Sequence, residues 1–346
     1  MNSLLDYSGV VTKIRAMQKN LLTDDDFREI VAMPDVSAIE AYLKKNPSYA
    51  EAFTNINESD IHREALEAVF GSIVFRDFAK IFNFADPEQE KFLKKYARRY
   101  EIRLLKKCLK YALAGKHPGD EILWHKDFFK KFTSLDVEAL HESSSLDMTL
   151  KALDGTEYYP VLMRVRNSGR AEGFDYETAL DMYHFSTIWR DRDRIVSKDS
   201  IKIISRIYGS RFDMLNIWYI KRAKQYYEMP EAQIYTLIIP VLYRLRQEDI
   251  RALVTAENED QFAAALSKTF YGKQYGELRP DNLEDMYGYI LRDVLRQEAK
   301  KHPYSVATIY RYLYLKEHEG EKLVAAVECV RYGIDPDEAF TYINAV

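Results

Sequence analysis

The stretch YARRYEIRLL at residues 96–105 returns in altered form twice more along the chain, as YGSRFDMLNI at 208–217 and YLKEHEGEKL at 314–323. Each copy has a tyrosine, an acidic residue five positions later and an aliphatic residue four positions beyond the acid. The acids are Glu101, Asp213 and Glu319. The tyrosines recur with a period of roughly 110 residues, far longer than the roughly 20 to 50 residues of solenoid repeats. Each copy therefore belongs to a small domain.

A second shared element lies upstream of each copy and ends in the dipeptide Arg-Asp. It reads ALEAVFGSIVFRD up to Asp77, ALDMYHFSTIWRD up to Asp191 and LEDMYGYILRD up to Asp293. The two elements keep the same order in all three places, so the sequence predicts a triplicated chain. We expect three similar domains, at residues 1–119, 120–229 and 230–346. Pro118-Gly119 and Met229-Pro230 mark the boundaries.

The composition favours helices over strands. Only 13 of the 346 residues are glycine, and apolar residues between 65 and 82 recur at the three-and-four spacing of an amphipathic helix. The best strand candidate, residues 155–165, is interrupted by Pro160 and can equally be a loop followed by a helix start. The sequence therefore predicts an all-α fold.

Local signals also place several helix ends. Asp86-Pro87 combines a capping acid with proline at the first helical position, and Asp335-Pro336 repeats the pattern near the C-terminus. Gly115 is the type of residue that ends a helix by adopting a left-handed conformation. Thr23, followed by three aspartates, is interpreted as another helix N-cap.

The charge and the apolar pattern of the sequence restrict where the protein is expected to be located and which partners it is expected to bind. The net charge is −4 with 30% charged residues, so nucleic acid is not an expected partner. Cys108 and Cys329 lack metal or disulfide spacing. The N-terminus lacks the pattern of a secretory signal, and the longest apolar stretch, residues 235–243, is about half the ~20 residues needed to cross a bilayer. We expect a cytoplasmic protein that contacts a membrane only through partners.

Motifs for catalysis or cofactor binding are absent from the sequence. It contains no GxxxxGK[ST] or GxGxxG loop for phosphates and no HExxH for zinc. Asp24-Asp25-Asp26 does not continue as the DDxxD of magnesium-dependent prenyl-diphosphate enzymes, because Arg28 occupies the fifth position. Asn57-Glu58-Ser59 matches a glycosylation sequon that has no role in the cytosol. We expect no catalytic, cofactor-binding or metal-binding residue.

The repeated charged residues have two interpretations besides simple packing. Arg76, Arg190 and Arg292 can pair with Glu101, Asp213 and Glu319 within their own domains, or these residues can contact a partner protein. The basic clusters are interpreted as solvated helix faces, with acidic partner loops as the alternative. These clusters are Lys94-Lys95, Arg98-Arg99, Lys106-Lys107 and Lys300-Lys301.

Both ends of the chain resemble one known family. The tail PYSVATIYRYLYLKEHEGEKLVAAVECVRYGIDPDEAF, residues 303–340, resembles the C-terminal signature of the C-type subunit of the V-type ATPases, in which a tyrosine-rich helix runs into Lys-Glu-x-Glu. Here the motif is Lys316-Glu317-His318-Glu319. The opening KIRAMQKNLLTDDDFREIVAMPDVSAIEAYL, residues 13–43, resembles the family's Arg-x-Met and Leu-Leu pattern. With the triplication, the resemblance covers essentially the whole chain.

One departure from the family pattern follows the motif. The family continues from its last Glu with an aliphatic residue and Asn-Leu, whereas this chain has Gly320 to Leu323, and Asn216 holds the Asn place in the middle copy. A glycine inside a helix costs ~1 kcal/mol relative to alanine. We therefore expect the last copy to be locally looser or kinked at Gly320.

The resemblance implies a non-catalytic protein, equivalent to the d-type subunit of eukaryotic V-type ATPases, with three helical domains arranged as a pseudo-three-fold funnel. Such a protein sits on the cytoplasmic mouth of the membrane ring of proteolipids and receives the central stalk, built from D- and F-type subunits. It couples rotation to the transport of protons or sodium. The resemblance also implies a peripheral location on the cytoplasmic face of a membrane, one copy per complex, no homo-oligomer and no cofactor.

Two rival functions differ from this one in testable ways. A helical adaptor without a rotary role would share the composition and the repeats and differ in its partners. A helical enzyme would need convergent acids or a cofactor pocket, and would show turnover or tight binding of a divalent metal.

Overall fold

The computed structural model describes residues 3–52, 63–169 and 172–345. Every regular element within these residues is a helix, and no strand occurs among them, which confirms the all-α prediction. The chain divides into two compact units: a first unit of residues 1–176 with 303–346, and a second unit of residues 177–302. The division into three domains at 119 and 229 stays a prediction.

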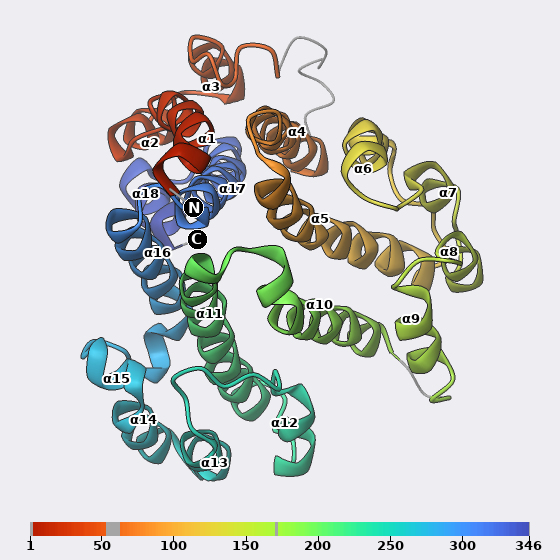
Figure 1. Ribbon diagram of the computed structural model, residues 1–346, viewed down its shortest axis with the longest axis vertical. Helices are drawn as coiled ribbons and strands as arrows, with labels where there is room; N and C mark the ends of the chain where they lie inside the picture. The colour runs from red at the N-terminus through yellow and green to blue at the C-terminus, as the bar shows by residue number, and fades with distance from the viewer. Residues whose placement is uncertain (1–2, 53–62, 170–171, 346) are drawn as a thin grey trace. The chain divides into compact units, whose positions relative to one another are not determined.

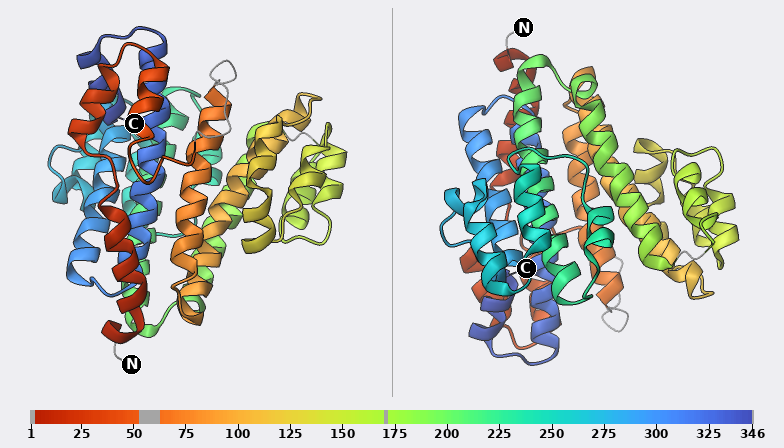
Figure 2. Two further views of the ribbon diagram at one scale, coloured as in Figure 1. Left: turned by 90° about the horizontal axis from the view of Figure 1, so that it is seen from above. Right: turned by 90° about the horizontal axis from the view of Figure 1, so that it is seen from below.

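The first unit is built around the long helix α17 (Val306–Arg331). Figures 1 and 2 show this helix, in blue, with the N-terminal helix α1 in red alongside it. The two ends of the chain therefore belong to one body. The helices that pack on α17 are α1 (Ser3–Gln18), α2 (Asp24–Val31), α3 (Val36–Leu43), α4 (Arg63–Phe82) and α18 (Pro336–Ala345).

One hydrophobic core joins these helices. Ile30 from α2, Leu43 from α3, Phe70 from α4, Leu323 from α17 and Ile343 from α18 are all buried in it. Burying such a side chain stabilises the fold by about 1.5–3 kcal/mol, so the N-terminal segment contributes directly to holding α17 in place.

The rest of the first unit consists of one long helix and a row of short ones. Phe75 and Phe78 of α4 pack in an aromatic cluster with Tyr100 of α5 and with Phe128 and Phe132 of α6. These helices are α5 (Pro87–Leu113), η2 (Asp120–His125), α6 (Lys126–Phe132), α7 (Val137–His141), α8 (Leu146–Ala152) and α9 (Tyr159–Arg166).

The second unit repeats the combination of long and short helices. Its long helix α11 (Lys198–Gln225) packs against α12, α13 and α16. Its other elements are α10 (Gly173–Ile195, which begins just inside the first unit), α12 (Glu231–Leu237), α13 (Gln247–Thr255), α14 (Glu259–Lys268), α15 (Phe270–Gln274), η3 (Pro280–Asn282) and α16 (Leu283–Lys301).

The predicted helix ends are confirmed. The carboxylate of Asp86 accepts the N–H groups of the first turn of α5, and Thr23 caps α2 in a reciprocal box with Asp26. Gly115 follows the end of α5 with φ at +67°. The strand candidate at 155–165 is a loop followed by the start of α9, with Pro160 in the first turn.

Helix α17 is continuous through Gly320, and the expected local loosening or kink stays a prediction. Gly320 is buried and faces α4, where a Cβ built on it would lie 3.4 Å from the Cβ of Phe70. A side chain as small as alanine would therefore fit between α17 and α4 at this position.

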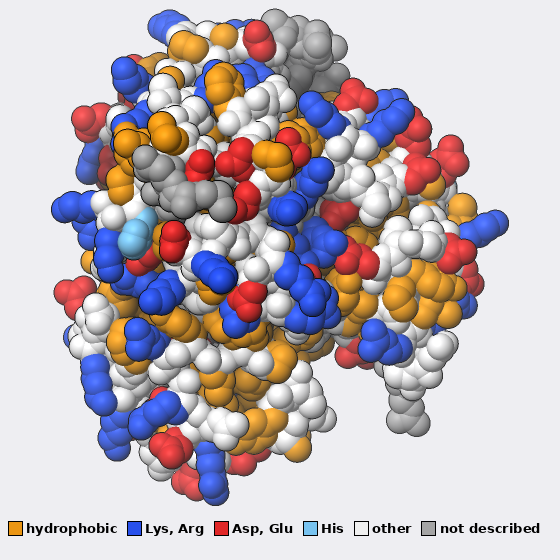
Figure 3. Space-filling model, viewed as in Figure 1, with side chains coloured by type: hydrophobic (Ala, Val, Ile, Leu, Met, Phe, Trp, Pro, Cys, Tyr) orange, Lys and Arg blue, Asp and Glu red, His pale blue; other side chains and the backbone are white. Residues whose placement is uncertain are grey.

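In the view of Figure 3, basic, acidic and apolar side chains all reach the surface. This agrees with the near-neutral net charge of −4. Among the described residues, no helix combines the length and the apolar character needed to cross a bilayer.

Candidate functional site: the polar network on α17

The motif Lys316-Glu317-His318-Glu319 lies in the middle of α17, and three of its four residues are buried. Lys316, Glu317 and Glu319 are 2%, 6% and 5% exposed. Buried charges are costly unless they are paired and hydrogen-bonded, so the partners of these side chains define what the motif does.

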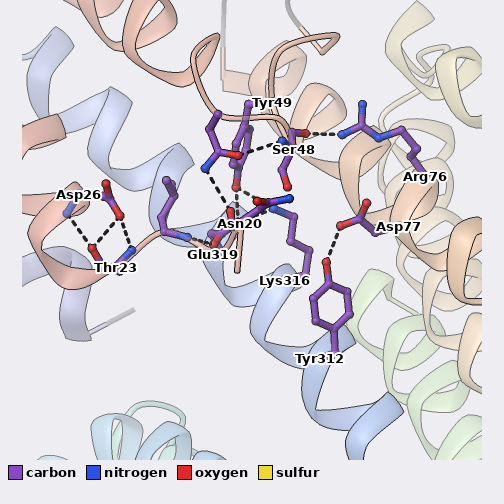
Figure 4. A network of polar contacts seen from close by, with 12 residues as sticks. Asn20, Thr23, Asp26, Ser48, Tyr49, Arg76, Asp77, Tyr312, Lys316 and Glu319 are labelled. Atoms are coloured by element: carbon purple, nitrogen blue, oxygen red, sulfur yellow. Dashed lines mark hydrogen bonds and ion pairs between the residues drawn. The ribbon is translucent and has the colours of Figure 1, made fainter. Parts of the chain in front are cut away.

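Glu319 binds the N-terminal segment of the chain (Figure 4). Its Oε2 accepts a hydrogen bond from the backbone N–H of Leu22 at 2.6 Å, and its Oε1 accepts one from the hydroxyl of Tyr49. Lys316, one turn earlier on α17, donates to the same Oε1. One carboxylate therefore fastens both ends of the segment 22–49 to α17.

Tyr49 lies between the two charges of this site. The Lys316 ammonium donates to the Tyr49 hydroxyl at 3.1 Å and lies 4.3 Å from the centre of its ring. Burial and the neighbouring Glu319 carboxylate raise the pKa of Tyr49 well above its usual value. Tyr49 therefore stays a neutral hydrogen-bond donor.

Glu317 points to another partner, the long helix α5. The hydroxyls of Tyr96 and Tyr100 donate to Oε1 of Glu317 at 2.8 and 2.5 Å, and Arg99 pairs with Oε2 at 2.9 Å. Arg99 also donates to the Tyr96 hydroxyl at 2.7 Å. Adjacent residues of the motif thus tie α17 to two different parts of the first unit.

The Arg-Asp dipeptide of α4 completes the network in Figure 4. Asp77 is buried and accepts a hydrogen bond from Tyr312 of α17 at 2.6 Å. Arg76 donates to the backbone carbonyl of Ser48 and pairs with Glu51 at 3.1 Å. We call the contacts of Tyr49, Asp77, Tyr312, Lys316 and Glu319 the α17 network.

The acids equivalent to Glu319 make the same type of contact elsewhere. Glu101 of α5 accepts hydrogen bonds from the hydroxyl of Tyr158, at 2.6 Å, and from the backbone N–H of Ser134. Asp213 of α11 accepts the hydroxyl of Tyr271 at 2.9 Å. Its carboxylate oxygens also accept hydrogen bonds from the backbone N–H groups of residues 243–245, with N–O distances of 2.6–3.1 Å. Burial raises the pKa of both Glu101 and Asp213.

Each of the three acids therefore holds a segment of similar build, which we call a cap. The caps are residues 22–49 on α17, 134–158 on α5 and 243–271 on α11. Each begins with backbone N–H groups bound by the acid, continues through two short helices and ends at a tyrosine that donates to the acid.

The caps are structural segments that the sequence analysis missed, although a signal for them exists. The second short helix of each cap has a short polar N-cap, namely Asp35, Ser145 and Asn258. A tyrosine follows each of these residues by roughly a dozen positions. A search for a third repeated element at the same period would have found it.

The predicted pairing of the repeated arginines with the acids is wrong. In the described part of the chain, Glu101, Asp213 and Glu319 bind tyrosines, backbone N–H groups and Lys316 instead. Arg190 pairs with its neighbour Asp191 at 2.9 Å. The physical reason is that a backbone N–H of a cap has no other partner there, so the acid satisfies it.

Several basic residues predicted to face solvent have partners inside the chain. Arg98 pairs with Glu157 at 2.8 Å, Lys107 pairs with Glu121 at 2.7 Å, and Lys95 is buried. The predicted solvated face is wrong for Lys95, whereas Arg98 and Lys107 remain partly exposed.

Within the ranges that the structure describes, no group of three or more His, Cys, Asp or Glu residues is placed to hold a metal ion. The thiols of Cys108 and Cys329 are free and buried, and burial raises the pKa of Cys108 to about 12. The Asn57 sequon lies outside the described residues. The carboxylates of the α17 network accept hydrogen bonds from donors of the same chain.

The comparisons with known proteins agree with the resemblance found in the two ends of the chain. Residues 10–342 match the profile of the ATP synthase (C/AC39) subunit family. The C-type subunit of the A-type ATP synthase of Thermococcus kodakarensis is 23% identical, over 98% of this chain and 91% of that protein. Its counterpart in Pyrococcus abyssi is 27% identical, over 96% and 88%. The chain belongs to the ATP synthase (C/AC39) subunit family.

Proposed function

We propose that this chain is the non-catalytic coupling subunit of a rotary ATP synthase, joining the central stalk to the membrane ring of proteolipids. The observation that carries the proposal is the family match along residues 10–342, which includes all three caps and the α17 network. In this role the protein transmits torque between the stalk and a ring that moves protons or sodium ions.

The α17 network supports a role under mechanical load. A coupling subunit has to transmit force with little deformation, and close-packed protein interiors are as dense as molecular crystals. Charge-assisted hydrogen bonds from Lys316 and Arg99 to buried carboxylates add directional ties between α17, its cap and α5. Elements tied in this way resist sliding along one another.

The proposal includes the position and the partners of the protein. It lies on the cytoplasmic face of the membrane, reaches the bilayer only through its partners, and contacts stalk subunits of D and F type and the ring proteolipids. Its three helical domains form the funnel that receives the stalk. Three caps held by equivalent acids support the threefold repetition.

The first test removes the chain from the assembled complex and measures both activities of the motor. ATP hydrolysis is expected to continue without the chain, whereas ATP-driven ion uptake into vesicles is expected to stop and to return when purified chain is added back. Ion uptake that proceeds equally well in complexes lacking the chain would overturn the coupling role.

A second test identifies the partners. The tagged chain is recovered from membranes in mild detergent and its companions are identified by mass spectrometry, with the tag alone as control. Stalk subunits together with the ring proteolipid are the expected companions. Recovery of neither, from cells that contain the assembled motor, would favour a helical adaptor without a rotary role.

A further inference from the structure

The second unit contains a pocket of about 130 Å³ at the joint between α11 and its cap. Since a cavity needs about 10–15 Å³ by the same measure to hold one water molecule, the pocket has room for a small polar group. Its walls come from α11, α15, α16 and the start of the cap. They include Arg206, Ser210, Tyr243, Arg244, Phe270 and Tyr271.

The pocket occurs where this copy of the repeat differs from the other two. Three positions before the anchoring acid, α5 has Arg98 and α17 has Lys316, and both side chains make a polar contact with their own cap. Helix α11 has Ser210 at this position, and its hydroxyl hydrogen-bonds Tyr271 of the cap. The short serine leaves open the space beside Tyr271 that a long basic side chain occupies in the equivalent joints.

A cation is nevertheless a poor occupant of this pocket. The nearby acid, Asp213, is fully buried and already accepts three backbone N–H groups and the Tyr271 hydroxyl. The walls instead carry two guanidinium groups. That of Arg206 is neutralised by Glu298 at 2.6 Å, which leaves Arg244 to set the charge of the pocket.

Arg244 has the features of a receptor for a carboxylate. It is exposed, and it makes no ion pair within the residues that the structure describes. Its guanidinium lies over the rings of Tyr243 and Phe270, 5.1 and 5.2 Å from their centres. The rings hold the group in place and leave its N–H groups available, and this planar fork matches the two oxygens of a carboxylate.

The rim of the pocket is typical of a protein interface. Phe270 is 39% exposed, and Tyr289, 51% exposed, packs edge-on against the pocket residue Tyr275. Aromatic and arginine side chains are the residue types enriched at the centres of protein interfaces. A protein side chain is therefore a better match than a free ion, because a protein would also cover the exposed rings.

We propose that this pocket binds the carboxylate of an Asp or Glu side chain of a partner protein, held by Arg244 and covered at the rim by Phe270 and Tyr289. The identity of the partner as a component of the rotary complex rests on the proposed function. The pocket itself is a property of this chain, and its test separates the two claims.

The test places a photo-crosslinking residue, benzoyl-phenylalanine, at Phe270 of the full chain in its native cells and identifies the crosslinked segment by mass spectrometry. The same residue at Trp124, which is exposed on the first unit, is the control. We expect Phe270 to crosslink to a partner segment that contains an acidic residue, and Trp124 not to crosslink to that segment. Absence of any crosslink from Phe270 would overturn the proposal.

Charge reversal then tests the role of Arg244. Arg244→Glu is expected to lower recovery of the crosslinked partner by about tenfold. Arg251→Glu makes the same charge change at another exposed position of the cap and is expected to have no effect. Changing the partner's acidic residue to arginine should restore binding to Arg244→Glu. Equal effects of Arg244→Glu and Arg251→Glu, or failure of the reversal to restore binding, would overturn the proposal.

The two claims fail in different ways. If the crosslinked and restored partner is neither a stalk nor a ring subunit, and the tagged chain recovers neither the stalk nor the ring, the pocket stands and the rotary role is wrong. If Arg244→Glu does not lower recovery of the crosslinked partner while the chain still recovers the stalk and the ring, the rotary role stands and the pocket is wrong. Unchanged urea-unfolding midpoints of the variants would show that lost binding is not caused by unfolding.

Discussion

The joint between α17 and its cap and the joint between α11 and its cap use the same acid position with different surroundings. Glu319 accepts one backbone N–H and a tyrosine hydroxyl and has Lys316 beside it. Asp213 accepts three backbone N–H groups and a tyrosine hydroxyl, and has Ser210 where the lysine would be. The carboxylate of Glu319 is compensated by the charge of Lys316, whereas the carboxylate of Asp213 is compensated only by the dipoles of N–H and O–H groups.

The acid and the tyrosine that donates to it are the features that the two joints share. The basic residue is absent from the α11 joint, where backbone donors offset part of the cost of burying the carboxylate. Where the basic residue is missing, a pocket opens. The same repeated joint is thus filled by its own side chains on α17 and leaves a pocket on α11.

The largest effect is expected from Glu319→Gln. The substitution removes the charge that compensates buried Lys316, and breaking a buried pair in this way costs about 3–5 kcal/mol. The measurement is the urea-unfolding midpoint of the full chain. Glu142→Gln, at an exposed position of the first unit, should change the unfolding free energy by less than about 0.5 kcal/mol. Similar effects of both variants would contradict the network.

The second prediction asks how much of that cost comes from the lysine left behind. Replacing the pair together, as Lys316→Met with Glu319→Gln, is expected to recover about 1–2 kcal/mol relative to Glu319→Gln alone. The same urea experiment measures the difference. A double variant less stable than the single one would mean that Lys316 contributes mainly through its contact with Tyr49.

The third prediction compares a glycine of each joint. A Cβ at Gly209 of α11 would lie 2.4 Å from Cγ of Tyr243, so Gly209→Ala should destabilise the chain by about 1–3 kcal/mol. Gly320→Ala on α17 meets Phe70 at 3.4 Å and should instead stabilise by up to about 1 kcal/mol through helix propensity. Thermal unfolding of both variants decides the signs, and equal signs would refute the comparison.

The smallest effect concerns pH. Burial raises the pKa of Asp213 above its ordinary value of 3.8, so the folded state holds this proton more tightly than the unfolded state. The stability from this group is present below pH 3.8 and is lost as the pH rises through the raised pKa. Asp213→Asn should therefore flatten the fall of the unfolding free energy that sets in as the pH rises above 3.8. A dependence identical to that of the unaltered chain would contradict it.

Several parts of the fold were predictable because their causes are local. The helix N-cap residues Asp86 and Thr23 and the helix end at Gly115 depend on a few neighbouring residues, and the structure confirms all three. The buried acids were also visible as a repeated position. The partners of these acids were not predictable, because the sequence does not show whether a carboxylate binds an arginine or a backbone N–H.

The sequence by itself determined that the chain is helical, that it carries three copies of one pattern, and which family it belongs to. Only the tertiary structure decided how the copies are completed. The cap of α17 comes from the opposite end of the chain, since Glu319 binds the N–H of Leu22 across 297 residues of sequence. Likewise, α17 packs on α4 and α11 packs on α16, so a helix of one copy meets the Arg-Asp helix of another. Such contacts follow from burying helix faces together in space, and no local pattern encodes which face meets which.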